Sequence, residues 1–341
     1  MSVALESAPA PKCIVCGNAG RPLYSGMRDR LFSAPGKWRL VECPNAACGL
    51  LWLDPMPTPE TIGLAYADYY THAEGGFPRH ALSKLFARAK RAYLANVWGY
   101  AGVPAGDRVL GLLPYLYPGR RIDLDFSVMW LRPVPGGRLL DVGAGSGALV
   151  ERMNGLGWRA EGLDFDPRSV TAARGRGLTM HQGGLNPGRF AQGTYDVVTM
   201  SHSIEHVHDP LAWLAEARRI LKPGGRLVLA TPNARSFLHR RFREHWFALD
   251  PPRHLYLFNR DALGALLGRA GFRTFRLFTS VRDARAAWRG SRSIRATGRY
   301  DMMARAPLPL RLAGQAMQLA EGLAHVVDRD AGEDLVAEAR A

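Results

Sequence analysis

Three kinds of side chain are spaced so that they could do chemistry: paired cysteines near the start, glycines beside two aspartates in the middle, and histidines beyond them. The glycines stand in residues 139–147, which read L-L-D-V-G-A-G-S-G, with Gly143, Gly145 and Gly147 at every second position. Glycines after an apolar strand let backbone N–H groups approach a ligand closely, and the following helix start adds partial positive charge. The pattern predicts a site for a nucleotide-like cofactor.

Two aspartates narrow the choice of cofactor. Asp164 stands 17 residues past the third glycine, at the end of the next expected strand, where a carboxylate can hold both ribose hydroxyls. The spacing Gly143-x-Gly145-x-x-Ala148 also satisfies a dinucleotide fingerprint, so a nicotinamide cofactor stays open. Asp141, two residues before the first glycine, would repel a pyrophosphate and favours a cofactor with a positively charged amino acid end.

All four cysteines lie near the start of the chain, as two pairs about 26 residues apart, each followed by glycine: Cys13, Cys16, Cys43 and Cys48. Thiolates presented this way suit tetrahedral zinc. Two disulfides or four unrelated thiols are the alternatives, and disulfides are disfavoured without a secretion signal. Four sulfur ligands leave no open position, so we expect a structural zinc ion.

The elements that position these groups alternate between strand and helix from residue 137 onward. Strands are expected at residues 138–142, 160–165, 178–182, 195–201, 226–231, 272–278 and 333–339, with helices at 148–155, 168–176, 210–221 and 261–270. This alternation predicts an α/β fold, a Rossmann-like parallel sheet with helices on both faces.

Four segments are expected along the chain. They are a disordered lead (1–12), a zinc-binding module (13–70), a helical connecting region (71–132) and a cofactor-binding domain (133–341) with an insertion at 282–330 before its last strand. Tyr66, Tyr69 and Tyr70, at the end of the module, line either a substrate entrance or a contact between domains.

Composition limits the compartment and the partners. The 341 residues carry a net charge of +15, which indicates an acidic partner or merely the arginine usage of a GC-rich genome. The first residues lack the apolar core of a signal peptide, and no apolar run approaches the roughly 20 residues that a membrane span needs. We expect a cytoplasmic protein with at most peripheral membrane contact.

Five motifs together carry a family resemblance: L-L-D-V-G-A-G-S-G, G-L-D-F-D-P, Y-D-V-V-T-M-S-H-S-I-E-H-V-H-D-P, L-K-P-G-G-R-L-V-L-A-T-P-N and P-R-H-L-Y-L-F-N-R-D-A-L. In this order they resemble the class I S-adenosylmethionine-dependent methyltransferases, in the subgroup similar to ubiquinone-type O-methyltransferases. The cysteine pairs ahead of such a domain resemble sugar methyltransferases that carry a small zinc module.

The resemblance implies a role for each matching residue. Asp141 and the backbone of residues 143–147, Ala144 included, hold the methionine end of S-adenosylmethionine, and Asp164 binds its ribose. The residues expected around the adenine are Phe165, Leu185 and Ser201. The acceptor is a small molecule or is linked to a glycan or nucleotide-sugar, and methylation of oxygen or carbon is expected.

A base helps if the acceptor is a hydroxyl, and histidine suits that task near neutral pH. His202, His206 and His208 stand just past the strand at 195–201, at the edge where open α/β sheets bind ligands. His206 is the first choice for the catalytic base, with a structural hydrogen bond as its alternative, and His254 is the second choice.

Six arginines recur at steps of three and four residues inside the insertion, on one side of an expected helix: Arg282, Arg285, Arg289, Arg292, Arg295 and Arg299. They either face solvent or bind a phosphate of the acceptor. Two other functions stay open, a non-catalytic nucleic-acid-binding zinc protein with a cofactor-binding domain and an NAD-dependent oxidoreductase. A single aromatic residue, Trp288, lies within the basic run, which disfavours nucleic acid.

Overall fold

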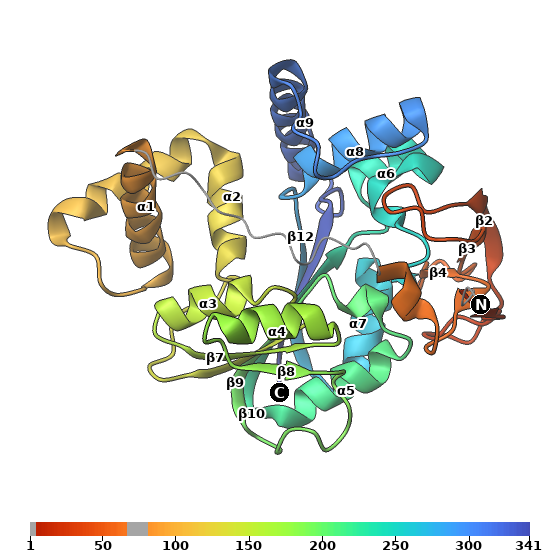
Figure 1. The fold of residues 1–341 in the computed structure, drawn as a ribbon, viewed down its shortest axis with the longest axis horizontal. Coiled ribbons are helices and arrows are strands. Elements are labelled where there is room, and N and C mark those ends of the chain that lie inside the picture. Colours follow the sequence, from red (N-terminus) through yellow and green to blue (C-terminus); the bar gives the residue numbers. More distant parts are fainter. Residues whose placement is uncertain (1–4, 67–80) are drawn as a thin grey trace. The chain divides into compact units, whose positions relative to one another are not determined.

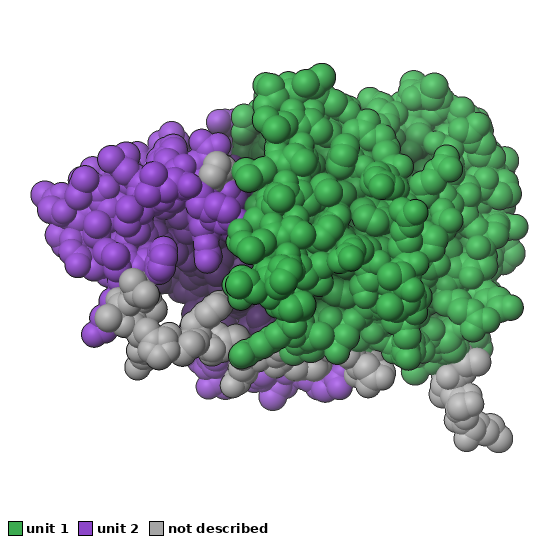
Figure 2. Space-filling model, turned by 90° about the horizontal axis from the view of Figure 1, so that it is seen from above, with its two compact units in different colours: residues 1–69, 202–215, 229–339 green, residues 70–201, 216–228, 340–341 purple. Residues whose placement is uncertain are grey.

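The computed structural model describes residues 5–66 and 81–341 (Figure 1). The chain forms two compact units (Figure 2). Unit 1 comprises residues 1–69, 202–215 and 229–339, and unit 2 comprises residues 70–201, 216–228 and 340–341. Tyr69 and Tyr70 lie outside the described residues, so their expected role is not addressed.

Unit 2 is built on parallel strands. β6 pairs in parallel with both β7 and β9, and β7 pairs in parallel with β8. The strands are β6 (Arg138–Val142), β7 (Arg159–Asp164), β8 (Met180–Gln182) and β9 (Tyr195–Ser201). Their apolar side chains are buried on both faces, as a parallel sheet between helices requires. The register sets Asp141 of β6 opposite Thr199 of β9.

The helices of unit 2 lie before and between the strands of its sheet. They are α1 (Ala81–Tyr93), α2 (Pro118–Ser127), α3 (Ala148–Gly155) and α4 (Pro167–Gly175), with a π-helix at Leu94–Trp98 and a 3₁₀ helix at Ala105–Leu116. The Asp166 side chain caps α4 by accepting from the backbone N–H of Arg168 at 3.0 Å. Helix α3 packs on β7, and α4 packs on β7 and β8 (Figure 1).

Strand β10 (Leu221–Pro232) runs from unit 2 into unit 1, and a helix, α5 (Pro210–Ile220), precedes it. The hydrogen-bonded strand order is β12-β13-β10-β9-β6-β7-β8, in which β12 (Thr274–Ser280) and β13 (Asp334–Arg340) belong largely to unit 1. The predicted α/β fold with a largely parallel central sheet is therefore confirmed.

Unit 1 also holds the cysteine-rich segment. Its four-stranded sheet has the order β11-β4-β3-β2 and is antiparallel throughout. The strands are β2 (Arg21–Met27), β3 (Trp38–Glu42), β4 (Leu51–Leu53) and β11 (Tyr256–Leu257), and a second sheet pairs β1 (Ser7–Ala8) with β5 (Met56–Pro57). The helices are α6 (Phe237–Phe242), α7 (Arg260–Arg269), α8 (Ala284–Thr297) and α9 (Leu308–Val327), with 3₁₀ turns at Ile62–Tyr66, Ile204–His206, Arg243–His245 and Phe247–Leu249.

Two expectations differ from the structure. The lead expected to be disordered contains β1, which pairs with β5 in the described part. The strand expected at 226–231 begins earlier, at Leu221, and the backbones of Gly224 and Gly225 bond Ala341 at the chain end. No helix within the described ranges combines the length and the apolar character that crossing a bilayer requires.

Candidate functional site

The glycine turn after β6 has the backbone that its sequence predicts. Gly143, Gly145 and Gly147 have φ angles of 79°, 51° and 76°, a region that side chains with a Cβ rarely adopt. The N–H groups of Gly143 and Ala144 bond the carbonyl of Leu163 at 2.8 and 3.1 Å, which ties the turn to β7. A Cβ at Gly145 would meet no atom within 4 Å, so that part of the turn faces open space.

Asp164, at the end of β7, is fixed by the same turn. Its carboxylate accepts from the backbone N–H of Gly145 at 2.7 Å and from that of Asp166 at 2.9 Å. Burial raises the pKa of Asp164, although these backbone donors oppose that shift. The acid is thus preoriented beside the glycine turn, in the position that the sequence predicts for a ribose ligand.

Asp141, near the end of β6, is 3% exposed. The Thr199 hydroxyl donates to its Oδ1 at 2.7 Å. Burial raises the pKa of Asp141 to about 7, with a smaller contribution from the negative charge of Asp164. A positively charged ligand group stabilises the ionised form of such a buried carboxylate, because the opposite charge offsets the cost of desolvation.

The three residues expected around an adenine differ in exposure. Phe165 follows β7 with 51% of its surface exposed, Leu185 is 1% exposed, and Ser201 ends β9 in a half-buried position. An exposed aromatic ring next to the preoriented Asp164 is suited to stacking on a flat ligand.

His206 and His254 meet in unit 1 through their rings, whose centroids are 4.7 Å apart in an edge-to-face arrangement. His206 Nδ1 lies 3.0 Å from the Arg253 carbonyl oxygen, which can only accept, so this nitrogen carries the hydrogen. The Tyr66 hydroxyl lies 3.0 Å from the same nitrogen. His254 Nδ1 donates likewise to the carbonyl of Ala248 at 2.8 Å. Both rings therefore keep a lone pair on Nε2.

The ionisable residues around His206 and His254 differ in their protonation states. Burial and the neighbouring His254 lower the pKa of His206 to about 4, so His206 is neutral near pH 7. Burial opposes the ionisation of Glu205, yet the adjacent His202, whose Nδ1 lies 3.5 Å from the Glu205 Oε1, lowers the pKa of Glu205 to about 2. Burial likewise opposes protonation of His202, but Glu205 and Asp334 raise its pKa to about 9. His202 is thus a cation, whereas His206 has the protonation state of a base.

Several residues that contact His202 and Glu205 could not be predicted from the sequence. His202 Nε2 lies 3.6 Å from Asp334 and 3.7 Å from Asp283, two acids more than 80 positions later in the chain. Buried Thr231 donates to Glu205 at 3.0 Å and so aligns that carboxylate.

Arg253, just before His254, is fully buried and forms two ion pairs. Its two terminal nitrogens donate to the two oxygens of Asp29 at 2.8 and 2.9 Å, and its Nε donates to Asp250 at 3.0 Å. A further bond to the Ala65 carbonyl, at 3.0 Å, connects the loop to the turn that contains Tyr66. This network fixes the backbone carbonyl that sets the tautomer of His206.

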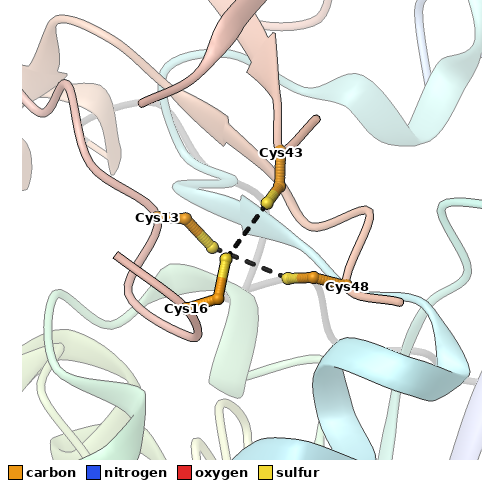
Figure 3. A group of neighbouring side chains, drawn as sticks. All are labelled: Cys13, Cys16, Cys43 and Cys48. Atoms are coloured by element: carbon orange, nitrogen blue, oxygen red, sulfur yellow. Dashed lines mark hydrogen bonds between the residues drawn. The ribbon is translucent and has the colours of Figure 1, made fainter. Parts of the chain in front are cut away.

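The four cysteines point toward one common centre (Figure 3). Their sulfur atoms all lie within 4.8 Å of one another, at 3.6 Å for Cys13 and Cys48 and 3.3 Å for Cys16 and Cys43. Sulfur atoms of a disulfide are about 2.05 Å apart, whereas a tetrahedron with Zn–S bonds of about 2.3 Å places them about 3.8 Å apart. The observed spacing fits a metal ion better than disulfides.

The predicted arginine side is divided in the structure. Helix α8 carries the four central arginines, of which Arg292 and Arg295 are exposed while Arg285 and Arg289 are half-buried. Arg282, just before the helix, pairs with Asp283 at 3.0 Å.

Residues 118–277 match the family model described as "Methyltransferase domain". The chain is 34% identical over 169 residues to the ubiquinone biosynthesis O-methyltransferase of Xanthomonas oryzae pv. oryzae (strain PXO99A), covering 47% of this chain and 64% of that protein. It is 35% identical over 151 residues to the protein of the same name from Cereibacter sphaeroides (strain ATCC 17025 / ATH 2.4.3), covering 41% and 61%. The chain thus spans less than two thirds of the length of either relative.

A solved structure from Thermotoga maritima, a methyltransferase described as a possible histamine N-methyltransferase, is also similar. It shares 18% sequence identity with a TM-score of 0.45, and the match covers 75% of this chain and 99% of that one.

Proposed function

We propose, on the premise that residues 118–277 form a methyltransferase domain of the class I, S-adenosylmethionine-dependent type, that this chain methylates a hydroxyl group of a small molecule. The family model and the curated relatives support the predicted resemblance to methyltransferases of the ubiquinone O-methyltransferase type over the residues that they match. The observation that carries the proposal is the pair Asp141 and Asp164 beside the open glycine turn, because the two acids match the charge and the hydroxyl groups of that cofactor.

The residues of unit 2 fit this cofactor one by one. Asp141 would hold the positively charged amino acid end, aided by the backbone of residues 143–147. Asp164 would accept from the ribose hydroxyls, for which its two backbone bonds have oriented it. Phe165 would cover the adenine, with Leu185 and Ser201 as the proposed remainder of that pocket.

S-adenosylmethionine supplies, when bound, a methyl group on a sulfonium that is already a good leaving group. The protein therefore contributes mainly alignment and the exclusion of water. We assign the catalytic base to His206, because its Nδ1–H is bonded to the Arg253 carbonyl and its neutral Nε2 is left to accept the acceptor's proton. His254, held in the same tautomer, is the second candidate.

We also propose that Cys13, Cys16, Cys43 and Cys48 hold one zinc ion. Four thiolates fill all the positions of a tetrahedral zinc ion, so the ion would stabilise the fold rather than activate a ligand. It would hold together the two turns of unit 1 that carry Cys13 with Cys16 and Cys43 with Cys48, the cysteine knuckles. Three of the four cysteines are buried, which suits a closed structural site.

The acceptor class, the role of the α8 arginines and the location in the cell remain predictions. The curated relatives favour a small-molecule oxygen acceptor, and an acceptor linked to a glycan or nucleotide-sugar is proposed from the zinc-module resemblance alone. A phosphate contact by the exposed arginines of α8 is proposed on their charge. A cytoplasmic location stays a prediction too.

The proposal is tested by calorimetry with S-adenosylhomocysteine and with NAD, followed by a screen of quinols, nucleotide-sugars and lipid-linked glycans with labelled methyl donor. We expect binding of the first nucleoside only and transfer to a quinol-like hydroxyl. Binding of NAD instead would overturn the cofactor assignment. Transfer to a sugar acceptor alone would keep the cofactor and replace the acceptor class.

A further inference from the structure

A cleft of about 790 Å³ opens in unit 1 beside the cysteine knuckles, and every residue that lines it belongs to that unit. One wall comes from β2 and from the segment that contains Cys43 and Gly49. The opposite wall comes from residues 234–243 and includes α6. A cleft of this size matches those that bind small molecules, about 300–1,000 Å³.

Four arginines line the cleft: Arg21, Arg235, Arg240 and Arg243. Three of them pair with acids at 2.8 Å, and these arginine side chains are 40–65% exposed. Exposed pairs of this kind contribute only about 0–1 kcal/mol, so a stronger anion can replace them. Arg240 and Arg235 each bond their acid through one terminal nitrogen, which leaves other N–H groups of the five on each guanidinium.

Arg243 differs from the other three arginines. It is exposed and forms no ion pair within the described ranges 5–66 and 81–341. Its backbone has a positive φ of 53°, immediately after α6. The cleft lining therefore carries four arginines against three acids, Glu42, Asp328 and Asp330, and Arg243 is the arginine among the four for which no ion pair is found in the described residues.

A polar pair provides a second kind of contact in the cleft. His239 Nδ1 donates to the Ala234 carbonyl at 2.6 Å, so its Nε2 accepts the hydrogen of the Tyr24 hydroxyl at 3.2 Å. Burial lowers the pKa of His239, which keeps the ring neutral in this arrangement, and Trp246 stacks on it with centroids 4.6 Å apart. The Tyr24 oxygen, its hydrogen committed, presents lone pairs that accept from a ligand hydroxyl.

The knuckle wall is fixed from outside the cysteine cluster. The Asn259 side chain donates to the carbonyls of Cys48 and Gly49 at 2.8 and 2.9 Å, and it also caps α7. A Cβ added at Gly49 would come within 2.8 Å of that amide. The wall is thus built for a fixed shape, as a preformed binding cleft requires.

We propose that this cleft binds a phosphorylated, hydroxyl-bearing small molecule, with Arg243 and Arg240 on the phosphate and Tyr24 accepting from a hydroxyl. Guanidinium groups bind phosphate through paired, charge-assisted hydrogen bonds, which are stronger than neutral ones. A ligand that carries both a phosphate and a hydroxyl group can bond the arginines and the Tyr24 oxygen at the same time.

The test is calorimetry on the full chain with three probes: pyrophosphate, glucose 1-phosphate and glucose. We expect both charged probes to bind and glucose not to. Arg243→Gln should weaken both charged probes about tenfold or more. Arg241→Gln is the matched control, because it removes the same charge two residues away, at the end of α6, from a side chain that does not line the cleft.

Tyr24→Phe separates the two kinds of contact. It should weaken glucose 1-phosphate about fivefold and leave pyrophosphate unchanged, since only the sugar donates to the lost hydroxyl. The proposal is overturned if Arg241→Gln and Arg243→Gln weaken the affinity for the charged probes equally. It is also overturned if neither charged probe binds the wild type at millimolar concentration. Binding of S-adenosylhomocysteine serves as the folding control and tests the transferase assignment separately.

Discussion

Asp141 makes the affinity for the nucleoside depend on pH. Burial raises its pKa to about 7 in the free protein, and a ligand ammonium beside it requires the carboxylate form. Binding below that pKa must therefore first remove a proton. With a pKa of about 7, the ionised fraction is about 76% at pH 7.5 and about 9% at pH 6.

The ratio of these fractions sets the expected effect. The affinity for S-adenosylhomocysteine should fall about eightfold from pH 7.5 to pH 6, which corresponds to about 1.3 kcal/mol. The measurement is isothermal calorimetry at several pH values at constant ionic strength. Proton release on binding, seen as a dependence of the heat on buffer ionisation, should grow toward pH 6.

Two variants connect the effect to this side chain. Asp141→Asn keeps the shape, removes the titrating group and should give weak binding that no longer changes between pH 6 and 7.5. Thr199→Val removes the hydroxyl that lowers the pKa of Asp141, so the midpoint should move above 7. The reasoning is refuted if wild-type affinity is constant over this range or if Asp141→Asn retains the full dependence.

Three further outcomes are expected. Purified wild type should contain one zinc ion per chain by atomic emission, and Cys43→Ser should lose it and lower the melting temperature; wild type without metal would contradict the site. His206→Ala should lower kcat by about 10²–10⁴ and leave the affinity for S-adenosylhomocysteine unchanged, and an unaltered kcat would remove the base. Arg253→Met leaves the buried carboxylates of Asp29 and Asp250 without their cation and should lower the free energy of unfolding in denaturant by about 3–5 kcal/mol. The surface change Arg241→Met should lower it little.

The local patterns of the sequence predicted the cofactor half of the fold. β6, α3 and β9 begin and end at the predicted residues, because β6 and β9 are short, largely apolar runs and α3 starts directly after the glycine turn. The start of α4 is fixed just as locally, because the Asp166 side chain that caps it bonds a residue two positions later. Asp141 and Asp164 could be predicted for the same reason, as both stand at the ends of recognisable strands.

Features that depend on distant partners could not be predicted. The extra residues at the start of β10 pair with the last residue of the chain, Ala341. The buried ion pair of Arg253 and Asp29 joins positions 224 residues apart, and nothing near Arg253 in sequence indicates that it is buried. Likewise, the raised pKa of His202 depends on Asp334, which lies 132 positions later in the chain, so its charge could not be predicted from the sequence around it.

The roles of Asp141 and Asp164 are tested most directly by a crystal structure of the chain soaked with S-adenosylhomocysteine. We expect the amino end of the nucleoside at Asp141 and its ribose on Asp164. Density for the nucleoside at any other place, or none at saturating concentration, would contradict these roles.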